Sequence, residues 1–264
     1  MSERRLIVHA SKRELAESVA ARFISSLGKT LAVKEVAHVV LTGGSMGAAV
    51  LGVVNASAER DSVDWTRVHF WWGDERWLPR GDAERNETQS REALLDHITI
   101  DASRIHPLAA SDDGVELDDA AVAYARELAA HAPPGSRLPQ FDITFLGVGP
   151  DGHVASLFPL RSGIRLKEAN VIGVRDSPKP PPERLSLTLP AINSSERVWL
   201  VLAGSDKASA LGLTLAGVSP NEVPAAGVRG ALRTDFYVDS EATAEVPEQL
   251  TTTEIFWTAA DSPE

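Results

Sequence analysis

Short runs rich in β-branched and aromatic residues alternate along this chain with longer amphipathic stretches at helical spacing. Such alternation is the pattern of βαβ units and favours a mainly parallel sheet. We therefore expect an α/β, doubly wound, Rossmann-like fold with helices on both faces of the sheet. The predicted strands are residues 6–10, 37–42, 68–72, 141–148, 171–174 and 197–203, and the predicted helices are residues 12–27, 46–58, 85–97, 117–131 and 207–216. Three predicted N-caps are Ser11, Ser45 and Ser205.

The 264 residues are enough to bury a sizeable core in one piece. Two Pro- and Gly-rich stretches, 132–139 and 177–182, are interpreted as loops within one domain rather than as linkers. A single α/β domain is expected over residues 1–243. Residues 244–264 are rich in Thr, Glu and Ala with weak periodicity, which fits a C-terminal extension that is an edge element or partly disordered.

Charge and residue usage exclude several classes of function. With 26 Lys and Arg against 37 Asp and Glu, the net charge of −11 argues against partners such as nucleic acid or anionic membrane. The absence of Cys removes disulfides, Cys nucleophiles and thiolate-bound metals, and favours a cytoplasmic location. The seven histidines include no pair at the usual ligand spacing along a helix, so no metal site is expected.

The first motif that carries chemistry is Thr-Gly-Gly-Ser-Met-Gly at residues 42–47, between a predicted strand and a predicted helix. Glycines there let the N–H groups of Gly43, Gly44 and Ser45 point into one concavity, which suits a phosphate. The same letters match Gly-x-Ser-x-Gly, the nucleophile elbow of α/β-hydrolases. That fold places its triad His late in the chain, whereas the last His here is His153. A tight turn without a ligand also fits.

The second motif is Gly-Val-Gly-Pro-Asp-Gly-His at residues 147–153. It imitates a dinucleotide fingerprint, but Pro159 interrupts the helix that a Rossmann crossover needs at this point. What remains is Asp151 and His153 on a glycine-rich turn at the carboxyl end of a strand. His can take a proton from water near neutral pH, and a nearby carboxylate can fix its tautomer. A histidine that is merely exposed or hydrogen-bonded is the alternative.

The third motif places Asp74, Glu75 and Arg76 between large aromatic residues just after a predicted strand. Half-buried charges need partners, and Arg is suited to bidentate contact with phosphate. A corner of mutually satisfied ion pairs fits the same residues. Two more cations are candidates: Arg184 follows a Pro-rich run, and Lys207 begins a predicted helix, where its charge opposes the helix dipole unless an anion lies nearby. A solvated lysine is the alternative for Lys207.

Taken in order, these motifs resemble the 6-phosphogluconolactonase family, part of a larger group that includes glucosamine-6-phosphate isomerase/deaminase. The deaminase branch has a similar Asp-Gly-His turn that continues into a segment with a Glu, whereas residues 156–159 here offer no carboxylate. The deaminase counterpart of Asp-Glu-Arg usually ends in Tyr instead of Arg76. The resemblance extends from about residue 6 to about residue 239, through segments 41–45, 72–76, 141–159, 181–188 and 204–207.

The resemblance implies hydrolysis of 6-phospho-D-glucono-1,5-lactone to 6-phosphogluconate, a step of the oxidative pentose phosphate pathway, without metal or cofactor. A δ-lactone needs a positioned base for water, stabilisation of the oxyanion and an anchor for the phosphate. We expect His153 to be the general base and Asp151 to orient it.

For the phosphate we expect the N–H groups around Gly43, Gly44 and Ser45, and for Asp74 the positioning of sugar hydroxyls or of Arg76. Which cation faces the oxyanion instead of the phosphate stays open. The expected cations are Arg76, Arg184 and Lys207.

Three alternatives remain at this point. A serine-hydrolase route would use Ser45, a sugar-phosphate sensor would bind without catalysis, and a deaminase-like isomerase would act on glucosamine 6-phosphate. The expected partner is a small phosphorylated sugar lactone, and the chain is expected to be a monomer or a weak homo-oligomer.

Overall fold

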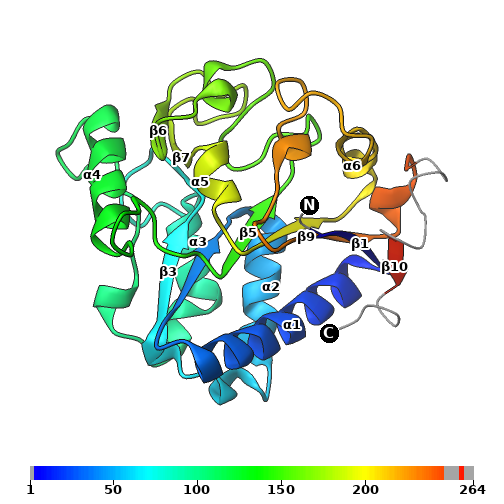
Figure 1. The fold of residues 1–264 in the computed structure, drawn as a ribbon, viewed down its shortest axis with the longest axis horizontal. Helices are drawn as coiled ribbons and strands as arrows, with labels where there is room; N and C mark the ends of the chain where they lie inside the picture. Colours follow the sequence, from blue (N-terminus) through cyan, green and yellow to red (C-terminus); the bar gives the residue numbers. More distant parts are fainter. Residues whose placement is uncertain (1–2, 247–255, 259–264) are drawn as a thin grey trace.

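Seven strands pair side by side, all in parallel, in the order β10-β1-β9-β8-β5-β2-β3 (Figure 1). The computed structural model describes residues 3–246 and 256–258. This main sheet confirms the predicted doubly wound, mainly parallel α/β fold. Its strands are β1 (Glu3–His9), β2 (Ala37–Leu41), β3 (Val68–Trp72), β5 (Ile143–Gly147), β8 (Arg197–Leu202), β9 (Arg233–Asp239) and β10 (Phe256–Thr258).

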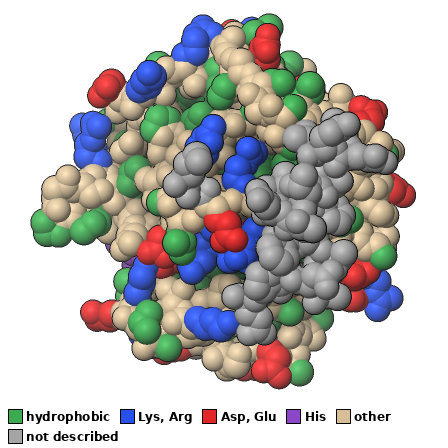
Figure 2. All heavy atoms as spheres, turned by 45° about the vertical axis from the view of Figure 1, so that its right-hand side comes forward, with side chains coloured by type: hydrophobic (Ala, Val, Ile, Leu, Met, Phe, Trp, Pro, Cys, Tyr) green, Lys and Arg blue, Asp and Glu red, His purple; other side chains and the backbone are tan. Residues whose placement is uncertain are grey.

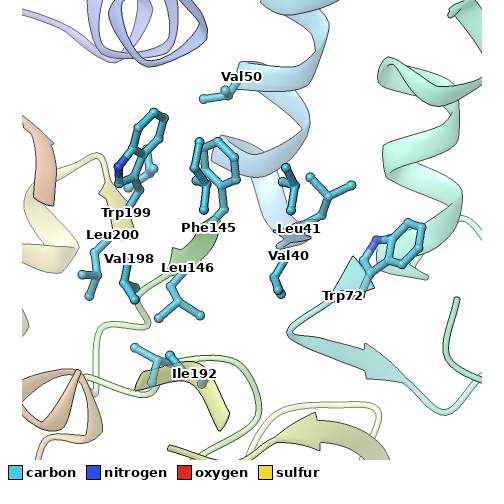
Figure 3. Close-up of a cluster of buried hydrophobic side chains, with 14 of the residues drawn as sticks. Val40, Leu41, Val50, Trp72, Phe145, Leu146, Ile192, Val198, Trp199 and Leu200 are labelled. Carbon is cyan, nitrogen blue, oxygen red and sulfur yellow. The ribbon is translucent and has the colours of Figure 1, made fainter. Parts of the chain in front are cut away.

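The core lies on both faces of the main sheet. Side chains alternate along each strand, so Phe145 points to the face covered by Val50 of α2 and Leu146 points to the face covered by Ile192 of α5 (Figure 3). Strands β2 and β3 are buried at every position, as expected when both faces are covered. The helices are α1 (Lys12–Val33), α2 (Gly44–Ala56), α3 (Asn86–Ala93), α4 (Leu117–Ala130), α5 (Leu189–Asn193) and α6 (Ala208–Leu215).

A second, smaller sheet stands at the carboxyl end of β3. It is antiparallel in the order β4-β7-β6, with β4 (Asp74–Arg76), β7 (Arg184–Leu187) and β6 (Val171–Val174). Gly73 joins the two sheets, because its N–H donates to Leu41 O at 3.0 Å and its carbonyl accepts from Leu187 N at 2.8 Å. The strand predicted at 171–174 is therefore present, but it belongs to this smaller sheet.

Several details differ from the sequence-based prediction, which contained neither the strands β4, β7 and β9 nor the helix α5. Helix α1 continues past its predicted end because Thr30 and Leu31 extend its buried face. Ser11 caps α1 as predicted, accepting from Glu14 N at 3.2 Å, whereas the N-caps of α2 and α6 are Gly43 and Lys207 instead of Ser45 and Ser205. Short 3-10 helices lie at Arg60–Ser62, Trp65–Arg67, Leu95–His97, Ala102–Arg104, Ser162–Arg165, Ser205–Lys207, Pro224–Gly227 and Glu241–Thr243.

Within the predicted C-terminal extension 244–264, β10 pairs in parallel with β1 at the edge of the main sheet. Residues 247–255 and 259–264 of that extension lie outside the described residues. None of the helices in the described part of the chain has the length and apolar character that spanning a bilayer requires.

Candidate active site

The site lies where the order of strands reverses. The chain runs from β2 outward to β3 and returns to β5 on the other side of β2, so the loops after β2 and β5 diverge and open a crevice. A cavity of about 290 Å³ occupies this crevice. Its walls come from both sheets and from α3, and they are formed by Thr42, Gly43, Gly44, Asp74, Arg76, Asn86, Gly147, Val148, Gly149, His153, Ala155, Lys179, Pro180, Arg184 and Lys207.

The loop after β2 brings backbone against the cavity. Gly43 is the N-cap of α2 and supplies no side-chain cap, and a Cβ on it would lie 1.7 Å from Asn86 Oδ1. Gly44 has a φ of 80°, which other residues rarely adopt. Glycine at both positions therefore lets this backbone at the N-terminus of α2 line the cavity. The N–H of Gly44 donates to Gln89 Oε1 at 3.1 Å. Ser45 is exposed in the first turn of α2 and does not contribute to the lining of the cavity.

The turn after β5 brings Asp151 and His153 together. Asp151 Oδ1 lies 2.5 Å from His153 Nδ1, and a Cβ on Gly149 would lie 2.0 Å from that same nitrogen. Burial opposes ionisation of Asp151, but the hydrogen bond with His153 and the charge of Lys179 outweigh it and lower the pKa to about 2. An ionised carboxylate only accepts, so Nδ1 of His153 carries a proton, and in the neutral form of the ring the lone pair is on Nε2.

The carboxylate of Asp74 is buried and fully engaged. Ser156 Oγ donates to Asp74 Oδ2 at 2.7 Å, and Asn86 Nδ2 donates to Asp74 Oδ1 at 3.1 Å. Asn86 is thereby held with its Oδ1 beside Gly43, and among the described residues that buried oxygen has no hydrogen-bond partner. An acceptor left unsatisfied at a cavity wall is available to a ligand.

The predicted cations all reach the cavity. Arg76 donates through Nη1 to Glu84 O, while its buried Nε has no partner in the described part of the chain. Arg184 is buried, and its guanidinium donates to the carbonyls of Lys179, Pro180 and Pro181 at 3.0–3.2 Å. Burial lowers the pKa of Arg184.

Lys207 joins these arginines with Nζ 3.0 Å from Asp206 Oδ2. Four Lys or Arg residues thus line the cavity against one carboxylate, although the whole chain carries −11. Figure 2 shows several Lys and Arg side chains near the middle of one face, with others around its edge. Such a cavity attracts a small anion.

Three contributors were given no role by the sequence-based prediction, although Thr42 and Glu75 lie within its motifs. Lys179 lines the cavity, and the only indication of it in the sequence is an isolated Lys in a Pro-rich loop. Thr42 Oγ1 accepts from Gly147 N at 3.3 Å and so ties the loop after β2 to the end of β5. Glu75 is almost fully buried, and its carboxylate accepts from the backbone N–H groups of Arg76, Asn86 and Glu87 at 2.7–2.9 Å. These bonds fix the position of β4 relative to α3.

Comparison with known proteins decides the family. A family model described as glucosamine-6-phosphate isomerases/6-phosphogluconolactonase matches residues 10–236. The chain belongs to this family. It is similar to the 6-phosphogluconolactonase of Streptomyces coelicolor, with 49% identity over 93% of this chain and 95% of the relative. It is also similar to the 6-phosphogluconolactonase of Mycobacterium tuberculosis, with 44% identity over 88% of this chain and 94% of the relative.

Solved structures agree on the fold. The 6-phosphogluconolactonase of Thermotoga maritima superposes with a TM-score of 0.77 at 29% identity, over 89% of this chain and all of that chain. A monomeric glucosamine-6-phosphate deaminase superposes almost as well, with a TM-score of 0.76 at 19% identity over 91% of this chain and 99% of that chain. The fold therefore does not distinguish the two activities, and only the residues of the site can do so.

Proposed function

We propose that this protein hydrolyses 6-phospho-D-glucono-1,5-lactone to 6-phospho-D-gluconate, a step of the oxidative pentose phosphate pathway. The observation that carries the proposal is the Asp151–His153 pair, which opens onto a cavity lined by four cations and a helix N-terminus. The similarity to lactonases over nearly the whole chain supports it. The cytoplasmic location and the monomeric or weakly oligomeric state expected above are part of the proposal and rest on the sequence alone.

In this proposal His153 is the general base. Its Nε2 takes a proton from water while the water oxygen bonds to the lactone carbonyl carbon. The tetrahedral oxyanion collapses, the bond from that carbon to the ring oxygen breaks, and the imidazolium returns the proton to the ring oxygen, which becomes a hydroxyl. Asp151 holds the ring of His153 and stabilises its charged form.

The phosphate is held, in the same proposal, by the N–H groups at Gly43, Gly44 and Ser45, and it replaces Gln89 Oε1 as the acceptor of the Gly44 N–H. Helix N-termini favour phosphate because several N–H groups converge there with the positive end of the helix dipole. One or more of three cations neutralise the phosphate, and the remainder face the oxyanion. These cations are Arg76, Arg184 and Lys207.

Asp74 does not bind the substrate directly in this scheme, because both of its carboxylate oxygens already accept hydrogen bonds within the protein. We assign it the positioning of Asn86, whose free Oδ1 then accepts from a sugar hydroxyl. The side chain of Ser45 is given no role. A serine nucleophile requires a base such as histidine as the hydrogen-bond partner of its hydroxyl. Among the described residues the Ser45 hydroxyl has no such partner, and Nδ1 of His153 is hydrogen-bonded to Asp151.

The test is a lactonase assay with freshly generated lactone, read against the spontaneous rate of opening. The expected result is rapid, saturable hydrolysis. Binding of 6-phosphogluconate without any acceleration would instead indicate a sugar-phosphate sensor. Release of ammonia from glucosamine 6-phosphate, with no lactone hydrolysis, would indicate the deaminase branch.

A further inference from the structure

Four of the seven histidines gather at the edge of the main sheet opposite the cavity. His38 and His69 are the second residues of the parallel strands β2 and β3, and their rings stack with centroids 4.7 Å apart. His106 follows the 3-10 helix Ala102–Arg104, and His131 is the C-cap of α4, with centroids 4.6 Å apart. The proposed lactone chemistry uses none of these four residues.

Three of these rings bring nitrogen atoms close to one point. One nitrogen each from His69, His106 and His131 lies within 4.8 Å of the other two, and His69 Nδ1 lies 2.8 Å from His106 Nε2. The positions of these histidines along the chain do not indicate a metal site, because they are 25 or more residues apart. These three histidines come from a strand, a loop and a helix end, so tertiary structure alone brings them together.

Glu127 of α4 supports two of the rings in the way that metal-binding histidines are commonly supported. Its carboxylate oxygen Oε1 lies 2.6 Å from His106 Nδ1, and its backbone carbonyl oxygen lies 3.0 Å from His131 Nδ1. Both Nδ1 atoms therefore carry protons, and both Nε2 atoms keep lone pairs. A carboxylate or carbonyl behind the imidazole fixes the ring and raises its basicity as a ligand.

The cluster is walled on one side and open on another. Trp71 stacks on His106 with ring centroids 3.8 Å apart, which holds that ring in place. His38 and His131 line a second cavity of about 290 Å³, together with Lys34 and Asp142. His131 is partly exposed, so an ion can reach the cluster from solvent through this cavity.

Arg104 opposes a cation at this place. Its Nη1 is in contact with His69 Nε2, so that nitrogen accepts and His69 Nδ1 donates its proton toward His106 Nε2. For His69 Nδ1 to bind a metal, the proton of this ring must move to Nε2. The side chain of Arg104 then has to turn away, because its guanidinium would face the Nε2–H donor of His69 and the positive charge of the bound metal ion.

We propose that His69, His106 and His131 form a binding site for a divalent transition-metal ion of the Zn²⁺ class, with water from the second cavity as the fourth ligand. Three neutral imidazoles with one open position match the preference of Zn²⁺ for nitrogen ligands and tetrahedral geometry. The site ties the amino-terminal end of β3 to the end of α4, and it is separate from the proposed lactone cavity.

The experiment titrates Zn²⁺ into the chelator-treated, full-length protein by calorimetry, with Co²⁺ absorption in the visible range as a report of tetrahedral geometry. The expected result is one ion per chain. Because His131 is partly exposed, His131→Ala is expected to fold normally by circular dichroism, to weaken binding at least about 100-fold and to keep its lactonase activity. Exposed His97 gives the matched control, since His97→Ala should bind as the wild type does.

Two further variants test the arrangement itself. Glu127→Gln should weaken binding about tenfold, because the carboxylate behind His106 is lost. Arg104→Gln should tighten binding at least about tenfold, because a repelling charge leaves. No bound Zn²⁺, or binding that survives His131→Ala but disappears in His153→Ala, would overturn the proposal. The second outcome would move the ion to the lactone cavity.

Discussion

Asp151 and His153 are joined side chain to side chain at 2.5 Å across a turn in which Gly149 leaves the room that their contact needs. The pair lies on the loop after β5, and His153 lines the cavity. Gly43 and Gly44 of the loop after β2, which are proposed to bind the phosphate, line the same cavity.

His153→Ala is expected to lower kcat by about 10²–10⁴-fold with little change in KM, because a general base acts in the transition state and adds little to substrate binding. The measurement is steady-state lactonase kinetics corrected for spontaneous opening. His97→Ala is the control, since His97 is exposed and does not line the cavity. An unchanged kcat would remove His153 from the role of base.

Asp151→Asn tests the orienting role separately. Asn can present an N–H to Nδ1 of His153, which favours the tautomer whose Nε2 is protonated and unable to accept from water. We expect kcat to fall about 10²–10⁴-fold while the protein stays folded. Because the pKa of Asp151 is lowered to about 2, this carboxylate stays ionised throughout the neutral range, and its own titration should leave no mark on the pH profile above about pH 4.

Gly43→Ala should damage both stability and substrate binding. Its Cβ would lie 1.7 Å from Asn86 Oδ1, and Asn86 cannot yield easily because Asp74 holds it through two hydrogen bonds. We expect a loss of about 1–3 kcal/mol in the free energy of unfolding and at least about a tenfold loss in kcat/KM. Gly52→Ala in the same helix is the control: nothing lies within 4 Å of its Cβ, so stability should hold or rise. Equal behaviour of the two variants would contradict the crowding argument.

Ser45→Ala separates attack by water from a serine nucleophile. Since the Ser45 side chain is exposed and only its backbone is assigned to the phosphate, kcat should stay within about twofold of the wild type. Treatment of the wild type with a fluorophosphonate should leave Ser45 unlabelled by mass spectrometry. Complete loss of turnover together with labelling of Ser45 would establish an acyl-enzyme route instead.

Glu75 predicts a pH dependence of stability. Burial raises the pKa of Glu75 from 4.5 to about 7, against the charge of Arg85 and the backbone N–H bonds, which lower it. Between pH 4.5 and about pH 7, the folded state therefore binds a proton on Glu75 that the unfolded state releases. The stabilisation is complete below pH 4.5 and is lost as the pH rises through 7, by up to about 1.4 kcal/mol per pH unit.

The measurement is the urea midpoint at pH 5 and pH 8 for the wild type and for Glu75→Gln. The wild type should lose more stability over this range than Glu75→Gln does, because glutamine does not titrate. Exposed Glu59 gives the control, and Glu59→Gln should follow the wild type. Equal slopes for wild type and Glu75→Gln would contradict the assignment.

Charged residues explain why one central strand was missing from the sequence-based prediction. Strand β9 runs between β1 and β8 near the middle of the main sheet, yet it was not predicted, because Arg233 and Asp235 interrupt its apolar pattern. In the fold these two side chains pair at 2.9 Å, which compensates the burial of Asp235. A partner two residues away on the same strand face cannot be recognised from hydrophobic periodicity.

What the sequence by itself determined is local. The spacing of apolar residues, the glycine-rich turns and the order of the motifs predicted the α/β class and most strand and helix positions. They also indicated the candidate residues at the ends of β2, β3 and β5. These features can be predicted because each one depends on residues that are neighbours in the chain. Only the tertiary structure decided which of these ends meet. The order of the strands places the loops after β2 and β5 at one crevice and brings Lys179 and Asn86 into its wall. The fold also gathers three histidines at the opposite edge of the sheet, namely His69, His106 and His131. The sequence alone could not show these contacts, because they join segments that are far apart in the chain.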